Sequence, residues 1–194
     1  MVRRFNLFLL ALIVLIGGPF YWLMIDNRPG DVPPKPITIA QLRQLAASIP
    51  GAAPSVVEYQ TTALRLLPRG LFAAGSGLKR HPIVVNAFRL PVPGGKPILI
   101  DSGLHPVDAA AMGMDMINKG GQQAIDRALQ SAGMILFTHE HPDHMGALLR
   151  QGGPAMQAAW FNPGQLPAEP LAGSLTWPSG FTPRAQIGGK APQA

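Results

Sequence analysis

The sequence of 194 residues contains no cysteine. Disulfide-stapled scaffolds, zinc ribbons, cysteine nucleophiles and iron–sulfur sites are therefore excluded within this chain, because each of them needs sulfur ligands or thiols. Any metal site must be built from histidine and carboxylate side chains.

Charged residues make up 13% of the chain and aromatic residues 7%. Only seven Asp and three Glu are present, and the formal net charge is +6. Lys and Arg are scattered singly or in pairs, and no basic run is interleaved with aromatic residues that stack on bases. We therefore expect no nucleic-acid partner. The low charge density instead indicates that part of the chain avoids water.

A long apolar run near the N-terminus predicts a membrane segment. Residues 7–25 contain no charge, and about 20 apolar residues let a helix cross the hydrocarbon core. Arg3 and Arg4 precede the run, so the N-terminus should stay cytoplasmic while the rest lies on the periplasmic or extracellular side. We assign residues 1–25 to a transmembrane anchor or signal segment, with membrane contact over residues 5–25. Because no Ala-x-Ala cleavage site follows, we favour the anchor, and secretion after signal cleavage is the alternative.

The rest of the chain is expected to form one domain behind a linker. Residues 26–36 are polar and rich in proline, which is typical of a stiff spacer, and residues 37–194 follow as an α/β domain. The predicted elements are a helix over 38–48, a strand over 55–67, two strands over 82–92 and 96–101 joined by a Pro-Gly-Gly turn, a helix over 121–132, a strand buried on both faces over 133–138 and a short helix over 145–151.

The last predicted strand runs directly into a cluster of ligand-type side chains. Residues 138–146 read Thr-His-Glu-His-Pro-Asp-His-Met-Gly and hold three of the chain's five histidines. Residues two apart in an extended segment project to the same side, so the imidazoles of His139 and His141 should meet while Glu140 points away. The pair can share one metal ion.

Asp143 and His144 follow at the expected turn before the short helix. From there their side chains can face a second metal position close to the first, as in hydrolytic sites with two metals. Imidazole and carboxylate suit Zn²⁺ best, with Fe or Mn as alternatives.

These residues resemble a known family. His-x-His-x-Asp-His after a hydrophobic strand is the signature of the metallo-β-lactamase-fold hydrolases. The segment from Ile98 to Gly103, which contains Asp101, resembles the strand ending in Asp-Thr/Ser-Gly that precedes the signature in that family. The resemblance covers residues 82–149 and implies the first half of an αββα sandwich.

The resemblance also implies roles for single residues. His139 and His141 would bind a first metal and Asp143 and His144 a second, with two zinc ions in a complete domain. Asp143 would be catalytic as well, because it orients the bridging hydroxide, and Asp101 would support the ligands from behind. The implied function is a metal-dependent hydrolase that uses a metal-bound hydroxide to cleave a small-molecule ester, thioester, lactone, lactam or phosphodiester.

The sequence departs from the family after the signature. The 50 residues that follow His144 contain no His and no Asp, and Glu169 is their only acid, so the completing ligands are absent. We therefore expect an incomplete domain, either the N-terminal part of a longer enzyme or a truncated relative. The alternative is a non-catalytic, truncated membrane-anchored protein with a residual metal-binding cluster. The substrate and the oligomeric state are not predicted.

Overall fold

The structure is a computed structural model, and it describes residues 2–26, 31, 33–34, 36–48, 50–162, 165 and 176–182. Most of the predicted linker over 26–36 and much of the chain after residue 162 lie outside the described residues. The chain divides into two compact units, one formed by residues 1–49 and 66–83 and the other by residues 50–65 and 84–194. The predicted domain boundaries are not tested by this division and stay a prediction.

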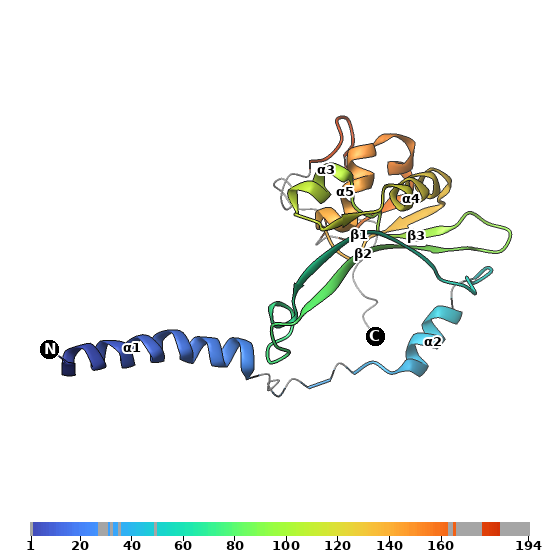
Figure 1. The fold of residues 1–194 in the computed structure, drawn as a ribbon. Coiled ribbons are helices and arrows are strands. Elements are labelled where there is room, and N and C mark those ends of the chain that lie inside the picture. The colour runs from blue at the N-terminus through green and yellow to red at the C-terminus, as the bar shows by residue number, and fades with distance from the viewer. Residues whose placement is uncertain are drawn as a thin grey trace. The chain divides into compact units, whose positions relative to one another are not determined.

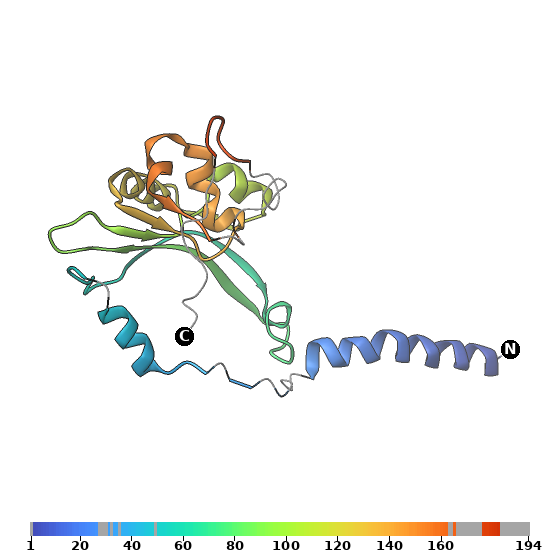
Figure 2. The same cartoon turned by 180° about the vertical axis from the view of Figure 1, so that it is seen from behind.

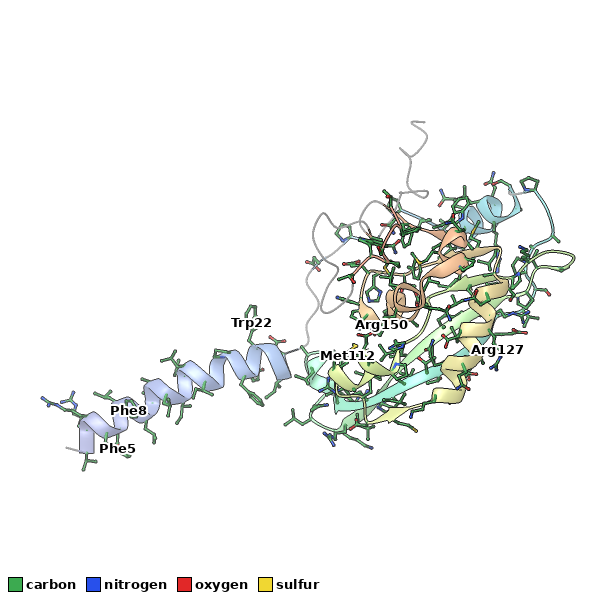
Figure 3. The ribbon with its side chains drawn as sticks, turned by 90° about the horizontal axis from the view of Figure 1, so that it is seen from above. Phe5, Phe8, Trp22, Met112, Arg127 and Arg150 are labelled. Carbon is green, nitrogen blue, oxygen red and sulfur yellow. The ribbon has the colours of Figure 1, made fainter. Side chains whose placement is uncertain are left out.

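The first unit contains the apolar N-terminal helix. Helix α1 spans Val2–Phe20 and continues into a π-helical turn at Tyr21–Ile25. Every described side chain of α1 is exposed, and Figure 3 shows Phe5 and Phe8 projecting outward from it. Within the described residues, α1 is the one helix long and apolar enough to cross a membrane. It is consistent with either a signal sequence or an anchor.

Helix α2 spans Ile39–Ala47 and confirms the helix expected over 38–48. Thr38 caps it, since its hydroxyl accepts a hydrogen bond from the Gln41 backbone N–H at 3.2 Å. The Gln41 side chain in turn accepts from the Thr38 backbone N–H at 2.7 Å. This reciprocal capping box satisfies two of the backbone donors that a helix start leaves unpaired.

The strands form a mixed six-stranded sheet in the order β4-β1-β2-β3-β5-β6. Strand β3 pairs antiparallel with β2 and parallel with β5, and β5 pairs parallel with β6. The two strands joined by the Pro-Gly-Gly turn, β2 and β3, are confirmed. Strands β4 and β6 were not predicted, because two residues each carry no periodic pattern. The strand bounds are β1 Glu58–Pro68, β2 Arg80–Leu90, β3 Ile98–Ile100, β4 Met116–Ile117, β5 Met134–Leu136 and β6 Ala159–Trp160.

Three helices lie together on one face of the sheet (Figures 1 and 2). They are α3 Pro106–Ala111, α4 Lys119–Ser131 and α5 Pro142–Gln151. Helix α4 confirms the helix expected over 121–132, whereas α3 was not predicted. Between these helices and the sheet lies the main hydrophobic core, to which Ala87, Leu99 and Ile135 contribute one fully buried residue from each of β2, β3 and β5. A short 3-10 helix, Gly153–Ala158, follows α5.

The opposite face of the sheet is less covered. Alternation places Ile98 and Ile100 of β3, and Met134 and Leu136 of β5, on the face away from Leu99 and Ile135, and all four are only half-buried. The expectation that the strand over 133–138 is buried on both faces is therefore wrong within the described part of the chain. Its helix-side residues are buried, and its other residues stay half-exposed because no described element covers them.

Candidate metal centre

The parallel pairing of β3 and β5 brings two distant segments together at one end of the sheet. Ile100 lies opposite Leu136 in the register, so both strands end side by side. Just beyond them, the Asp101 backbone N–H donates to the Leu136 carbonyl at 2.8 Å. Asp101 has a φ of 63°, the one positive φ among the described residues other than glycine. This left-handed turn ends β3 and directs the chain toward α3.

The Asp101 carboxylate is buried and organises the side chains that follow β5. Only 2% of Asp101 is exposed. Its Oδ1 accepts hydrogen bonds from the Thr138 backbone N–H at 2.9 Å and from the Thr138 hydroxyl at 3.1 Å. Its Oδ2 lies 2.9 Å from His144 Nδ1. Asp101 thus lies directly behind His144, and its supporting role at a metal site stays a prediction.

Thr138 is a site residue that the sequence analysis missed. Its hydroxyl lies 3.1 Å from His139 Nδ1 and 3.0 Å from His144 Nδ1, in addition to its contacts with Asp101. The sequence offered one signal for Thr138, which is its position between the predicted strand and His139.

Ser102 ties the Asp-Ser-Gly turn to the start of α5. Its backbone N–H and its hydroxyl donate to the His144 carbonyl at 2.7 and 2.9 Å. Its oxygen also accepts from the Leu148 backbone N–H at 3.1 Å. Gly103 follows with a φ of 75°, and a Cβ there would lie 2.5 Å from the buried Gln122 side chain. Only glycine fits this close approach without displacing its neighbours.

Helix α5 begins earlier than the sequence analysis expected. His141 is its N-cap residue and Pro142 its first helical residue. Asp143 and His144 therefore lie in the first turn of the helix, not in a turn before residue 145. Proline is well suited to this position because its missing N–H would be unpaired there in any case. The carboxylate of Asp143 lies near the positive end of the helix dipole, which stabilises its charge.

Three of the predicted ligands converge. One ligand atom each from His139, Asp143 and His144 lie within 4.8 Å of one another, the spread of a site that could hold one metal ion. The His139 and His144 rings are 3.8 Å apart between centroids, and His144 Nε2 lies 3.3 Å from Asp143 Oδ2. The His141 ring packs edge-on against His139 at 4.7 Å, but His141 is exposed and is not among the three converging residues. Glu140, half-buried, is not among them either.

The electrostatics follow from this crowding. Burial lowers the pKa of His139, and the neighbouring His144 and His141 lower it further. Burial also lowers the pKa of His144, but its hydrogen bonds to Asp101 and Asp143 outweigh this effect and raise the pKa to about 9. Burial raises the pKa of Asp143, but the hydrogen bond and the charge of His144 outweigh it, so the pKa lies below its ordinary value. In the metal-free protein, the protonated His144 ring has an N–H at each nitrogen, and Nδ1–H faces Asp101 while Nε2–H faces Asp143.

The donor set fits a divalent transition metal. Two imidazoles and one carboxylate are ligands that Zn²⁺ accepts readily, and Fe or Mn accept them as well. Asp101 occupies Nδ1 of His144, which leaves Nε2 on the side of Asp143 for a metal. Histidine ligands are commonly oriented in this way by a carboxylate on the second ring nitrogen. The catalytic role of Asp143, and the division of the four residues between two metals, stay predictions.

The described part of the chain is thus an α/β protein with a mixed sheet and a His/Asp cluster that could hold a metal ion. No protein-family model and no curated protein sequence matches the chain. Structural matches to metallo-β-lactamase-fold lactonases and hydrolases extend over about half of it.

Three of these solved structures illustrate the likeness. A quorum-quenching N-acyl homoserine lactone lactonase is 17% identical with a TM-score of 0.39, over 50% of this chain and 42% of the lactonase. A probable metal-dependent hydrolase from Staphylococcus aureus is 13% identical with a TM-score of 0.36, over 51% and 42%. AidC, a dizinc quorum-quenching lactonase, is 16% identical with a TM-score of 0.36, over 53% and 39%. The chain spans less than half the length of these proteins.

Proposed function

We propose that residues 50–162 form the metal-binding half of a metal-dependent hydrolase with the metallo-β-lactamase fold. His139, Asp143 and His144 would hold a divalent metal, with zinc as the first choice. The observation that carries this proposal is that the ligand atoms of these three residues lie within 4.8 Å of one another. In addition, His144 Nδ1 lies 2.9 Å from the buried Asp101 carboxylate. A ligand histidine needs this second contact to keep its ring orientation and tautomer.

The layer arrangement supports the αββα part of the proposal. Three helices cover one face of the described sheet, and half-buried apolar residues of β3 and β5 line the other. An apolar sheet face is stable when a second layer packs on it. A second sheet on this face would complete the sandwich of two sheets between two helical layers.

The residues of the candidate metal centre would have different chemical roles. A bound metal supplies Lewis acidity and lowers the pKa of water, so that a nucleophile is available near neutral pH. Asp101 holds the His144 ring, Thr138 connects Asp101 with both histidines, and Asp143 is placed to accept a proton from, and so orient, a water molecule at the site. We propose hydrolysis of a small-molecule ester, thioester, lactone, lactam or phosphodiester for the whole protein. Among these, a lactone is the class that two of the compared proteins are named for.

Zinc binding by the full chain tests the proposal directly. The parent chain and its variants are purified in detergent and loaded with zinc. We expect each of the variants His139→Ala, Asp143→Ala and His144→Ala to bind zinc much more weakly than the parent chain. Glu140→Gln is the matched control and should keep the metal, because Glu140 is not among the converging residues. Metal content by mass spectrometry and competition with a chromophoric chelator measure the effect.

Two further readouts sharpen the experiment. If His141 shares a metal with His139, His141→Ala lowers the zinc stoichiometry or affinity, and if it does not, the predicted pairing is wrong. Turnover of a chromogenic lactone or ester by the zinc-loaded chain would rule out the non-catalytic alternative. Equal zinc loss in Glu140→Gln and His139→Ala would refute the ligand assignment.

A further inference from the structure

The connection between β1 and β2 presents apolar side chains to solvent. We call residues 69–80 the β1–β2 tip. Leu71, Phe72 and Leu78 in this tip are 61%, 58% and 62% exposed. Single exposed apolar residues are common on protein surfaces, but three large ones within eight residues of one tip are a local concentration of exposed apolar side chains, which is a feature of interaction sites.

This exposure is a property of an ordered tip. The Arg69 backbone N–H donates to the Lys79 carbonyl at 3.0 Å, and the Gly70 N–H donates to the Gly77 carbonyl at 2.7 Å. A 3-10 turn over Arg69–Leu71 is closed by a bond of 2.9 Å from the Phe72 N–H to the Arg69 carbonyl. Backbone groups paired in this way can approach an apolar phase without losing hydrogen bonds.

The charged residues of the tip itself have one sign. Arg69, Lys79 and Arg80 belong to the tip and are exposed. No Asp or Glu occurs between Glu58 and Asp101, so no acidic side chain on β1 beyond its first residue, on the tip or on β2 offsets these cations. Exposed apolar side chains flanked by Lys and Arg are typical of segments that bind the interface of a membrane with anionic lipids.

We propose that the β1–β2 tip docks on the surface of an anionic lipid bilayer, with Leu71, Phe72 and Leu78 at the boundary of headgroups and acyl chains. Arg69, Lys79 and Arg80 then contact the lipid phosphates. The proposal takes α1 as the membrane anchor expected from the sequence, which would keep a bilayer surface within reach of the tip. Residues 26–57 connect α1 and its π-turn to β1, nine of them in α2, and this connection spans up to about 90 Å when extended.

The absence of cysteine allows a test at single sites of the full chain. Ala73→Cys places one environment-sensitive fluorophore beside the intact apolar residues, and Gln123→Cys on α4 places the same label on an exposed control position. Each protein is reconstituted in phosphatidylcholine vesicles with or without phosphatidylserine, and lipids with a quencher on the acyl chain report contact. We expect strong quenching at position 73 in the anionic vesicles and little at position 123.

Charge variants form the matched comparison. In the Ala73→Cys chain, Lys79→Gln with Arg80→Gln should weaken docking of the tip about 30-fold, because each cation near an anionic surface adds to the binding. Lys119→Gln with Arg127→Gln removes two exposed cations from α4 and should leave the quenching unchanged (Figure 3 labels Arg127). Thermal unfolding of both pairs checks that they fold equally well.

Three results would overturn the proposal. The first is quenching at position 73 no stronger than at position 123. The second is equal quenching in neutral and anionic vesicles, which would remove the role of the cations. The third is concentration-dependent crosslinking between the cysteines at position 73, which would show that a second copy of the chain covers the tip. Loss of quenching in Leu71→Glu with Leu78→Glu, at unchanged thermal stability, would support it.

Discussion

Asp101 connects the backbone conformation of one segment with the side-chain chemistry of another. It adopts a φ of 63°, a region that residues other than glycine rarely enter and that costs about 1 to 3 kcal/mol when the surroundings impose it. The surroundings here are the Leu136 carbonyl, Thr138 and His144, all within hydrogen-bond distance of Asp101. The strained backbone therefore serves to place a buried carboxylate behind His144.

Asp101→Asn tests this positioning role. Since an amide neither carries a charge nor holds the His144 ring as firmly, we expect zinc affinity to fall about 10- to 100-fold. The pKa of His144 in the metal-free protein should also fall from about 9 toward its ordinary value. Chelator competition and an NMR titration of the histidines measure the two effects.

Asp126→Asn is the matched control for Asp101→Asn. Asp126 accepts a hydrogen bond from Gln122 at 2.8 Å and is not among the residues that contact His144. It should change neither the zinc affinity nor the His144 titration. A loss of zinc affinity in Asp101→Asn with an unchanged pKa of His144 would give Asp101 a merely structural role.

The raised pKa of His144 also makes the stability of the metal-free protein depend on pH. The folded state binds this proton more tightly than the unfolded state, whose pKa is about 6.5. The resulting stabilisation is fully present below about pH 6.5 and is lost as the pH rises through about 9. We expect the Tm, measured with a chelator present, to fall between about pH 6 and about pH 10, and to fall less in His144→Gln. An equal fall in both proteins would contradict this account.

At the scale of elements, an ion pair joins α3 to α5. The Asp108 side chain, 2% exposed, accepts two hydrogen bonds from the Arg150 guanidinium, one from Nε and one from Nη2. The hydrogen bond to Asp108 raises the pKa of Arg150 above its ordinary value. Helix α3 follows the Asp-Ser-Gly turn and α5 carries Asp143 and His144. The pair therefore joins the helix that follows the Asp-Ser-Gly turn to the helix that carries two residues of the candidate metal centre.

Arg150→Leu should be strongly destabilising, because it leaves the Asp108 carboxylate buried with its Arg150 hydrogen bonds lost. Because the Arg150 side of the pair is exposed, we expect a loss of about 1 to 3 kcal/mol in the free energy of unfolding, measured by urea denaturation. Replacing both residues, Asp108→Leu with Arg150→Leu, should cost less than the single change, since no buried charge then remains. Arg127→Leu, on the exposed side of α4, should stay within about 0.5 kcal/mol of the parent chain. A double variant as unstable as Arg150→Leu would mean that packing, not charge, dominates at this contact.

At the scale of the whole molecule, the exposed apolar helix α1 is consistent with a signal sequence or an anchor, and its flanking charges predict on which side of a membrane the remaining residues lie. Arg3 and Arg4 precede the apolar helix, and positive residues favour the cytoplasmic side. Reporter fusions after Pro36 should therefore be active when the reporter works outside the cytoplasm and inactive when it works inside. Reversing the charge with Arg3→Glu and Arg4→Glu should weaken this preference. Activity of the cytoplasmic reporter alone would contradict the predicted topology.

The sequence by itself determined the features that depend on neighbouring residues. The length of the apolar run gave α1, the Thr38 cap gave α2, and the Pro-Gly-Gly turn gave the β2–β3 pair. The ligand motif was predicted because its spacing is local as well. The start of α5 was missed although proline at a first helical position is a local signal, since the expected helix was placed after the ligands rather than around them.

Only the tertiary structure decided which distant residues meet. Asp101 and His144 are 43 positions apart, and their contact follows from the parallel register of β3 and β5. The Asp108–Arg150 pair follows likewise from the packing of α3 beside α5. The residues of one strand do not determine which strand pairs with it, because strand pairing depends on the free energy of the whole sheet together with its helical layer. For the same reason, the sequence predicted four candidate ligands, whereas the tertiary structure brings the ligand atoms of three of them together.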